Sequence, residues 1–423
     1  MKAVVLAAGE GQRLRPLTYT RPKHMIQIGG KPLLEYVLIA LREAGIKDIL
    51  LIVNYKAERI KEYFGDGSNY NMKIEYIPQK EIKGTANAFG MAESHIEGDF
   101  VAVYGDLLIT SSAVRSVLSL HKKTRSVVTL TTLNVDKPEY YGIIKVENDT
   151  VVGIIEKPSP EIAANNPINA GLYVFSPLIF EAIRRTRASS RGEMEVTDSI
   201  QLLIEAKEKV VAARISSGDW LDVGKPWDLL EANARILESM KPKVLGSVEE
   251  DAHLIGSVHV GEDARVRSGA YIEGPAYIGE GCDIGPNCYV RPYTSLGQNI
   301  RIGNACEIKN SIIMDHAHIG HLTYVGDSVI GEGCNLGAGT ITANFRFDTK
   351  SVKMQVRDKI VDSGRMKLGV MMGDNTKTGV GTLFMPGVKV GCNSWIGPNI
   401  VVHNDVPSET IVILRQQLEQ QHL

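Results

Sequence analysis

An aliphatic residue recurs at every sixth position along much of the second half of the chain. Steps of six residues meet Val248, Leu254, Val260, Val266, Ile272, Ile278, Ile284, Val290, Leu296, Ile302, Ile308 and Met314. If about a third of residues are aliphatic, chance gives such a run roughly twice in a million trials in one register. The repeat therefore predicts a triangular β-solenoid, in which each coil packs only on its neighbours.

Small side chains occupy the fourth position of most repeats, as the tapered interior of a solenoid requires. They include Ala252, Ala264, Ala270, Ala276, Cys282, Cys288 and Cys306. The register slips near Ile319, resumes at Val325 and continues from Met372 to Val402, with an inserted loop over 342–367. All five cysteines follow residue 280 without a CxxC pair. We therefore expect packing thiols in a reducing compartment, and neither a disulfide framework nor a thiolate zinc site.

The first half of the chain alternates strand and helix patterns instead. Predicted strands are Lys2–Ala8, Asp48–Asn54, Lys73–Ile77, Phe100–Tyr104 and Ser126–Leu133, and helical patterns lie at Leu33–Leu41, Lys56–Phe64, Ala86–His95 and Ser112–His121. This alternation predicts an α/β Rossmann-like domain with a doubly wound, mostly parallel sheet. Ligands of such sheets collect at the carboxyl ends of strands, so we expect a site at Gly9, Gly11 and the turn at 104–106.

Length and charge agree with two domains and exclude several partners. A chain of 423 residues is too long for one core, and we expect a first domain at 1–228, a linker helix at 229–243, a β-helix at 244–406 and a tail at 407–423. The formal net charge of -2 gives no general attraction to nucleic acid or to anionic membranes. The longest apolar runs are far too short for a membrane span, so we expect a cytoplasmic protein.

A glycine-rich loop with two cations follows the first predicted strand. The run from Leu6 through Gly9 and Gly11 leads directly to Arg13, and Lys23 follows ten residues later. Backbone N–H groups and two fixed cations suit a triphosphate. The loop lacks the third glycine of the dinucleotide fingerprint and the spacing of a P-loop, so it predicts neither of those sites.

The loop also resembles the signature of sugar-1-phosphate nucleotidylyltransferases, and the resemblance covers residues 1 to about 235. Matching segments continue at Gln79 with 84–86, at 104–106, 141–142, 156–158, 169–171 and 220–224. The resemblance implies catalytic roles for Arg13 and Lys23. It implies nucleotide contacts from Leu6, Ala8, Gly9, Gly11, Gln79, Gly84 and Thr85, and sugar-phosphate contacts from Tyr104, Gly142, Glu156 and Asn169. Asp106 and Asp222 would bind Mg²⁺, which prefers a few carboxylate oxygens together with phosphate and water.

Three histidines near residue 320 leave more than one hypothesis open. His316, His318 and His321 suit a zinc site of the kind that β-solenoid carbonic anhydrases share between subunits, and equally suit a solvated surface. The run from His321 to Asp327 also resembles the acetyltransferase signature of bacterial bifunctional N-acetylglucosamine-1-phosphate uridylyltransferases. That resemblance implies His321 as the general base, since imidazole ordinarily titrates near neutral pH.

The same resemblance implies a second sugar-phosphate site in the solenoid. Its residues would be Arg291, Lys309, Tyr324, Asn335, Asn344 and Lys350, and a similarity to archaeal relatives adds Lys353. Phe345 departs from the bacterial pattern, which has Tyr there, so one hydroxyl contact is absent.

Together these observations predict a bifunctional enzyme of the archaeal type with a left-handed parallel β-helix. It would N-acetylate glucosamine 1-phosphate, or galactosamine 1-phosphate, with acetyl-CoA and couple the sugar 1-phosphate to UTP or dTTP, giving UDP-GlcNAc or a related nucleotide sugar and pyrophosphate. We expect Mg²⁺ as the cofactor, small-molecule substrates and a homotrimer formed through the β-helix, with the two activities independent. The alternatives are a monofunctional nucleotidylyltransferase with a structural β-helix and a non-catalytic regulatory subunit.

Overall fold

The computed structural model describes residues 1–189 and 191–422, and these form two compact units. The first, which we call the sheet unit, contains residues 1–10, 22–25 and 33–222. The second, the solenoid unit, contains residues 11–21, 26–32 and the chain from Val223 onward. Two short segments of the N-terminal half therefore fold with the solenoid. No helix in the described part of the chain is long and apolar enough to cross a membrane.

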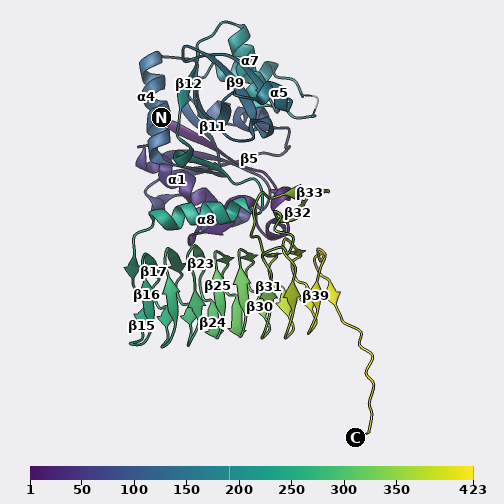
Figure 1. The fold of residues 1–423 in the computed structure, drawn as a ribbon. Coiled ribbons are helices and arrows are strands. Elements are labelled where there is room, and N and C mark those ends of the chain that lie inside the picture. The colour runs from purple at the N-terminus through teal and green to yellow at the C-terminus, as the bar shows by residue number, and fades with distance from the viewer. Residues whose placement is uncertain (190, 423) are drawn as a thin grey trace. The chain divides into compact units, whose positions relative to one another are not determined.

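The sheet unit is built on one nine-stranded mixed sheet (Figure 1). Its spatial order is β5 (Lys73–Pro78), β4 (Asp48–Val53), β1 (Lys2–Ala7), β6 (Phe100–Tyr104), β11 (Ile168–Phe175), β8 (Val128–Leu133), β12 (Val210–Arg214), β10 (Thr150–Glu156) and β9 (Gly142–Glu147). The strands are parallel from β5 through β6, while β11 runs antiparallel to both β6 and β8. The predicted parallel sheet is thus confirmed for its first half, and the rest is mixed.

Alternating side chains of β1 face two separate cores, which explains why helices cover both faces. Ala3 and Val5 join the core beneath α1 (Leu33–Glu43), α2 (Ala57–Phe64) and α4 (Ser111–Thr124). Val4 joins the core beneath α3 (Thr85–Gly90), α6 (Ile179–Arg185) and α7 (Val196–Glu205). The unit also contains α5 (Pro160–Ala163) and a two-stranded ladder of β7 (Leu107–Ile109) and β13 (Trp220–Asp222). Period-two burial on a central strand is typical of a doubly wound sheet.

The solenoid is a left-handed parallel β-helix with three faces, each one strand per coil. The first face consists of β14 (Lys243–Val244), β17 (Val258–Val260), β20 (Ala276–Ile278), β23 (Thr294–Leu296), β26 (Ile312–Ile313), β29 (Val329–Ile330), β34 (Met371–Met372) and β37 (Lys389–Val390). The second consists of β15 (Ser247–Val248), β18 (Arg265–Val266), β21 (Asp283–Ile284), β24 (Arg301–Asn304), β27 (His318–His321), β30 (Asn335–Leu336), β35 (Lys377–Thr378), β38 (Trp395–Ile396) and β40 (Ile411–Val412). The third consists of β16 (His253–Ile255), β19 (Tyr271–Glu273), β22 (Tyr289–Val290), β25 (Glu307–Lys309), β28 (Tyr324–Gly326), β31 (Ile341–Thr342), β36 (Leu383–Phe384) and β39 (Val401–Val402).

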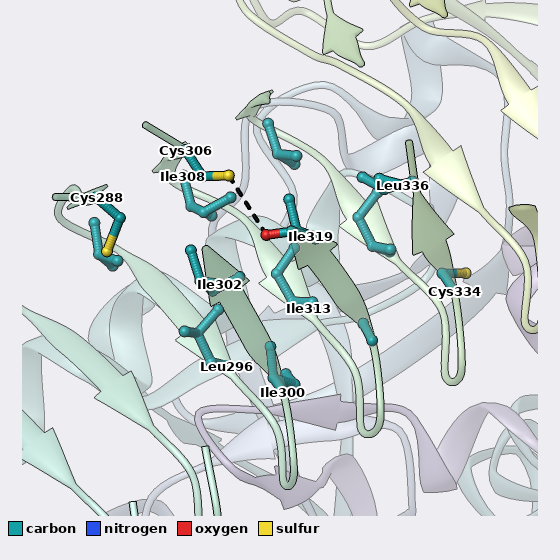
Figure 2. Close-up of a cluster of buried hydrophobic side chains, with 14 of the residues drawn as sticks. Cys288, Leu296, Ile300, Ile302, Cys306, Ile308, Ile313, Ile319, Cys334 and Leu336 are labelled. Carbon is teal, nitrogen blue, oxygen red and sulfur yellow. Dashed lines mark hydrogen bonds between the residues drawn. The ribbon is translucent and has the colours of Figure 1, made fainter. Parts of the chain in front are cut away.

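The aliphatic repeat fills the interior of the β-helix, as predicted, with one correction. Figure 2 shows inward side chains stacked coil on coil, such as Leu296 with Ile313 and Ile302 with Ile319. The inward residue after Ile308 is Ile313 and not Met314, because Ile313 pairs with Leu296 at a spacing of 17 residues. One coil is a residue short there, so a strict step of six overshoots. All five cysteines are buried and free, as packing thiols should be.

The three outer faces of the β-helix differ in what covers them. The outward residues in the middle of the first face are buried, namely Ser295, Ile312, Val329 and Met371. α8 (Asp228–Ser239) packs on this face at β23 (Figure 1) and contacts β2 (Gln27–Ile28), which pairs with β3 (Lys31–Pro32). The second face carries mostly polar outward side chains, and the third carries an exposed apolar column.

The inserted loop forms a hairpin of β32 (Lys353–Val356) and β33 (Lys359–Asp362). Beyond the last full coil, β40 pairs with β38 and closes the second face. The remaining described residues, 413–422, contain no helix or strand.

Candidate functional sites

Topology brings the two predicted metal ligands to one place in the sheet unit. Asp106 follows β6 directly and precedes β7, and Asp222 ends β13. In the antiparallel β7–β13 ladder Asp222 lies opposite Leu107, the neighbour of Asp106. The Asp106 carboxylate forms an ion pair with the ammonium group of Lys23, and both side chains are partly exposed. Two carboxylates and a lysine from distant segments thus share one solvent-accessible edge.

His24, which the sequence analysis did not single out, is buried beside this pair. Its Cδ2 lies so close to Gly105 that a β-carbon at that glycine would stand 3.2 Å away, and its Nδ1 has no hydrogen-bond partner in the described part of the chain. Burial, followed by the neighbouring Lys23 charge, holds the pKa of His24 well below its usual value. The imidazole is therefore neutral. The residue directly follows Lys23, where the matched signature ends, and no pattern in the sequence distinguished it.

The predicted base-binding residues surround the end of β5 and the start of α3. Gln79 is buried, and its side-chain amide donates to Asn87 Oδ1 at 2.9 Å. Gly84 has a φ of +117° and lies against the backbone of Met194, so a side chain there would collide with main chain. Thr85 Oγ1 accepts a hydrogen bond from the Val196 N–H at 2.9 Å. These contacts fix the loop before α3 against the start of α7.

The predicted sugar-binding residues form a second, more buried group. Gly142 pairs with Glu156 across the β9–β10 ladder, and a β-carbon at Gly142 would stand 2.7 Å from the Glu156 carboxylate. Asn169 Nδ2 donates to the Tyr173 hydroxyl at 2.6 Å, and that hydroxyl lies 3.2 Å from the hydroxyl of Tyr104. The glycine at 142 thus leaves room for the Glu156 carboxylate.

Electrostatics around Glu156 involve residues that the sequence analysis missed. Burial, and next the charge of Glu195, raise the pKa of Glu156. Arg191 lies 3.6 Å from Glu156 and forms a closer ion pair with Glu195, while Thr197 Oγ1 donates to Glu156 at 3.3 Å. Two carboxylates sharing one arginine make a polar recess suited to sugar hydroxyl groups.

Gly11 and Arg13 belong to the solenoid unit. Gly11 has a φ of +67°, and its carbonyl accepts hydrogen bonds from Leu14 N at 2.9 Å and Thr18 Oγ1 at 3.0 Å. Arg13 lies exposed on the following short 3₁₀ turn. Leu6, Ala8 and Gly9 lie at the end of β1 or just after it, within the sheet unit.

In the β-helix, the repeat stacks several predicted sugar-phosphate residues in one column. Lys309 lies opposite Gly326 on the next coil, and Arg291 occupies the equivalent position one coil earlier. Lys309 Nζ lies 2.8 Å from Asp327 Oδ2, and Asn344 Nδ2 donates both to that oxygen and to the Tyr324 hydroxyl. This cluster is centred on Asp327.

Asp327 is another residue that the sequence analysis left without a role. It is 2% exposed, and it also accepts a hydrogen bond from Asn310 Nδ2 at 2.7 Å. Glu307 pairs in the same way with Arg291, at 2.9 Å. Both cations therefore carry carboxylate partners that hold their side chains toward one end of the third face. The sequence signal for Asp327 was its place at the end of the matched motif.

Other predicted residues lie apart from this cluster. His321 is exposed at the corner between the second and third faces, whereas Lys309 lies at the opposite end of the third face. Asn335 is on the second face, opposite His318. Lys350 and Lys353 are exposed on the inserted loop. Within one chain, four of the predicted acetyl-transfer residues therefore lie together, namely Arg291, Lys309, Tyr324 and Asn344. The other predicted residues of that site lie apart from them.

His316 and His318 are exposed on the second face. Among residues 1–189 and 191–422, no three His, Cys, Asp or Glu side chains are grouped so that one chain alone could hold a metal ion.

A cavity of about 500 Å³ lies elsewhere in the solenoid unit. Gln12, Arg15 and Tyr19 line it from the N-terminal segment, Arg357 from the inserted hairpin, and Lys389 and Asp405 from the last coils. Burial lowers the pKa of Lys389 and raises that of Asp405. None of the predicted acetyl-transfer residues lines it.

Comparison with known proteins gives matches over both halves. Residues 2–239 match the family described as nucleotidyl transferase, and residues 272–366 match the GMPPB C-terminal domain. The UDP-glucose pyrophosphorylase structure solved with UDP-glucose superposes with a TM-score of 0.51 at 24% identity, over 56% of this chain and 99% of that one. This likeness supports the fold of the sheet unit.

Two archaeal relatives match along nearly the whole chain. The bifunctional protein GlmU of Methanocaldococcus jannaschii is 43% identical, covering 99% of this chain and 98% of the relative. The bifunctional sugar-1-phosphate nucleotidylyltransferase/acetyltransferase of Sulfurisphaera tokodaii is 42% identical, covering 96% and 98%.

Proposed function

The chain belongs to the nucleotidyl transferase family and to its bifunctional sugar-1-phosphate nucleotidylyltransferase/acetyltransferases, and from that membership we propose its substrates and the roles of its residues. The β-helix N-acetylates glucosamine 1-phosphate with acetyl-CoA. The sheet unit then couples the N-acetylated product to UTP and releases pyrophosphate. The observation that carries the proposal is that relatives named as bifunctional match this chain along nearly its whole length at 42–43% identity.

For nucleotidyl transfer, a phosphate oxygen of the sugar 1-phosphate attacks the α-phosphorus of the nucleotide. A new P–O bond forms as the bond to pyrophosphate breaks, and such a reaction needs positioning and charge neutralisation more than a protein base. Lys23 and Arg13 supply positive charge along the triphosphate. Asp106 and Asp222 are hard, partly solvated oxygen donors on adjacent positions, and this donor set fits Mg²⁺, which would neutralise phosphate charge there.

The buried carboxylate of Glu156 accepts hydrogen bonds from hydroxyl groups of the sugar. Asn169 and Gly142 shape the same recess. Since a carboxylate is only an acceptor when ionised, Glu156 selects a neutral polyol rather than another anion.

For acetyl transfer, the amine of the amino sugar attacks the thioester carbonyl carbon. The N–C bond forms, the C–S bond breaks, and CoA leaves as the thiol while His321 takes the proton lost by the amine. Lys309 and Arg291 hold the sugar phosphate, and Tyr324, Asn335 and Asn344 contact the sugar. Lys350 and Lys353 approach from the inserted loop.

A homotrimer formed through the β-helix completes this second site. Within one chain His321 and Lys309 lie at opposite ends of the third face, so a neighbouring copy is needed to bring a base and a phosphate site together. The outward column of the third face includes Tyr271, Ile341, Leu383 and Val401, which are between 37% and 42% exposed. A stripe of this kind suits burial against another copy.

Light scattering tests the assembly. Ile341→Glu combined with Leu383→Glu should yield monomers without acetyl transfer, while Lys377→Glu on the polar second face should leave the trimer intact. A monomeric mass for the unaltered protein, with acetyl transfer retained, would refute the trimer.

The match of residues 272–366 to the GMPPB C-terminal domain favours one alternative, a nucleotidylyltransferase whose β-helix has no chemistry of its own. A substrate matrix decides between the two and identifies the base and the epimer. The four NTPs and dTTP are combined with glucose, glucosamine, galactosamine and N-acetylglucosamine 1-phosphates, and pyrophosphate and CoA thiol are measured separately. Absence of CoA release with every amino sugar would leave only the alternative. Because acetyl-CoA and nucleoside triphosphates are cytoplasmic metabolites, the proposed reactions belong in the cytoplasm.

A further inference from the structure

The short segment that carries Lys23 lies between two segments that fold with the β-helix. Residues 11–21 and 26–32 belong to the solenoid unit, whereas residues 22–25 belong to the sheet unit. The chain therefore leaves the solenoid unit for four residues, presents Lys23 to Asp106, and returns. This arrangement makes the anchors on either side of Lys23 relevant to nucleotidyl transfer.

Arg21 is the anchor on the N-terminal side, and it is almost completely buried against the β-helix. Its guanidinium forms an ion pair with Asp374 and a second, at 3.0 Å, with Glu332. Nη1 also lies 3.5 Å from the Met314 sulfur, the residue that the shortened coil turns out of the core. Arg21 is 8% exposed and Asp374 is 4% exposed.

The two carboxylate oxygens of Asp374 have different partners, one in this segment and one in the β-helix. Oδ2 accepts from Arg21 and, at 2.6 Å, from Thr20 Oγ1. Oδ1 accepts the N–H of Glu332 at 2.9 Å, which fixes the carboxylate within the β-helix. On the other side of Lys23, Gln27 Nε2 donates to Asp315 at 2.9 Å, and Gly29 N donates to Asn233 Oδ1 of α8 at 2.8 Å. Both flanking segments are thus held by directional polar contacts.

A buried ion pair is a costly way to dock a loop. Removing two charges from water costs several kcal/mol per ion, and well-packed apolar residues of similar size often dock a segment as well or better. The Arg21 guanidinium, however, is held at several points, because Nη2 contacts both Asp374 and Glu332 while Nη1 lies at the Met314 sulfur, and such a planar group has a defined position and orientation. The Arg21 contact therefore suits a positional role better than a purely adhesive one.

Covalent connectivity carries that position to Lys23. Only Pro22 separates the two residues, so their α-carbons lie within about 7 Å of each other. Proline fixes its own φ and restricts the residue before it, which leaves few rotations to absorb a shift of Arg21. A displacement of Arg21 on the β-helix would reach the Lys23 ammonium group.

We propose that Arg21, through its ion pair with Asp374, is a positioning residue for nucleotidyl transfer that acts on Lys23 through the covalent chain between them. The proposal rests on the function proposed above, since it takes Lys23 as the residue that binds phosphate. It also limits the expected independence of the two activities. Changes in the sheet unit leave acetyl transfer unaffected, but changes at one place in the β-helix reach nucleotidyl transfer.

The test uses full-length Asp374→Ala, Arg21→Ala and Arg21→Lys, with pyrophosphate and CoA release measured on each preparation. We expect Asp374→Ala and Arg21→Ala to lower kcat for pyrophosphate release at least 10-fold and to raise KM for the nucleotide, with CoA release within twofold of the unaltered protein. Arg21→Lys should recover part of the loss. Asp283→Ala is the matched control, because it removes the Arg267 and Arg301 pairs of the same β-helix away from residues 11–32. It should change neither activity.

Free guanidinium ion separates positioning from charge compensation. At non-denaturing concentrations it can restore the charge opposite Asp374 in Arg21→Ala, but it has no bond to Pro22 and cannot place Lys23. Full restoration of pyrophosphate release by guanidinium would overturn the proposal. So would equal loss of both activities in Asp374→Ala and Arg21→Lys, or unchanged pyrophosphate release in Arg21→Ala.

Hydrogen exchange supplies a readout that does not depend on turnover. Peptides covering residues 11–25 should exchange faster in Asp374→Ala, while those from the β-helix interior should not. The variant Lys23→Ala tests the proposed role of Lys23 separately from the positioning role of Arg21. If it retains pyrophosphate release, the proposed role of Lys23 is wrong; if it loses release while the Arg21 variants keep it, only the positioning role is wrong.

Discussion

The two candidate sites of this chain are assembled in opposite ways. In the sheet unit, Lys23, Asp106 and Asp222 come from segments about 200 residues apart and meet because the chain repeatedly returns to one edge of a sheet. In the β-helix, Arg291, Lys309 and Asp327 follow one another at steps of 18 residues and lie on successive coils. Sheet topology creates the first site, and coil register creates the second.

This difference decides how far each site depends on its surroundings. A ligand at the end of a strand is held by the core of its own unit, so its loss should affect one activity only. A column on a β-helix face is flat and open, and it needs another surface to enclose a substrate. We therefore expect the proposed β-helix site to depend on assembly.

The largest effect should follow loss of either carboxylate of the sheet unit. Asp106→Asn and Asp222→Asn keep the size of the side chain but remove its charge, and we expect each to lower Mg²⁺-dependent pyrophosphate release at least 10³-fold. CoA release should be unchanged, because the proposed acetyl-transfer residues belong to the solenoid unit. Circular dichroism checks that each variant is folded. Equal loss of both activities in a folded variant would show that the two sites are not independent.

The next effect concerns His321. His321→Ala should lower CoA release by roughly 10²- to 10⁴-fold, as is typical for removal of a general base, and should retain pyrophosphate release. His316→Ala and His318→Ala on the second face should be milder, and EDTA should not affect acetyl transfer. Stoichiometric zinc by elemental analysis, with CO₂ hydration lost in all three variants, would make the β-helix site a metal centre instead.

A moderate, pH-dependent effect is expected at Glu156. Ionised Glu156 accepts hydrogen bonds from the sugar, and its pKa is raised by burial and by Glu195. As pH falls through this raised pKa, KM for the sugar 1-phosphate should increase. Glu156→Gln should raise KM roughly 10- to 100-fold at neutral pH, the value of a charged hydrogen bond, and should abolish this pH dependence.

The sign of the stability effect is opposite. A folded-state pKa above the unfolded value means that the folded protein binds the proton more tightly, so stability rises as pH falls through the raised pKa. Glu156→Gln should therefore be slightly more stable than the unaltered protein near neutral pH. Thermal unfolding across pH measures this, and an unchanged difference from pH 4 to 8 would contradict it.

The smallest expected effect concerns the cysteines, which should hardly react with a thiol reagent while the protein is folded. Burial raises the pKa of Cys282 and Cys288 to about 12, and all five thiols are buried in the solenoid unit. A thiol reagent at pH 8 should modify almost none of them in an hour and all five in denaturant. Because the sheet unit has no cysteine, this labelling reports on the β-helix alone. Rapid native labelling would show that its interior opens.

The sequence alone determined most of the architecture and the local composition of both sites. A strict six-residue period leaves only one set of side chains that can face inward, so Leu296, Ile302 and Ile308 could be assigned to the core without coordinates. The alternation of strand and helix patterns predicted the fold of the sheet unit. It also predicted that the ligand-binding residues lie at the ends of strands.

Only the tertiary structure decided three further points. It replaced Met314 by Ile313 in the core, because a coil one residue short cannot be seen in a pattern that is aliphatic at both positions. It set His321 and Lys309 at opposite ends of one face. It also folded residues 11–21 and 26–32 onto the β-helix, with Arg21 on Asp374, 353 residues later. Periodicity encodes contacts between repeats, whereas docking of a loop depends on a few non-local polar and apolar contacts that leave no period in the sequence.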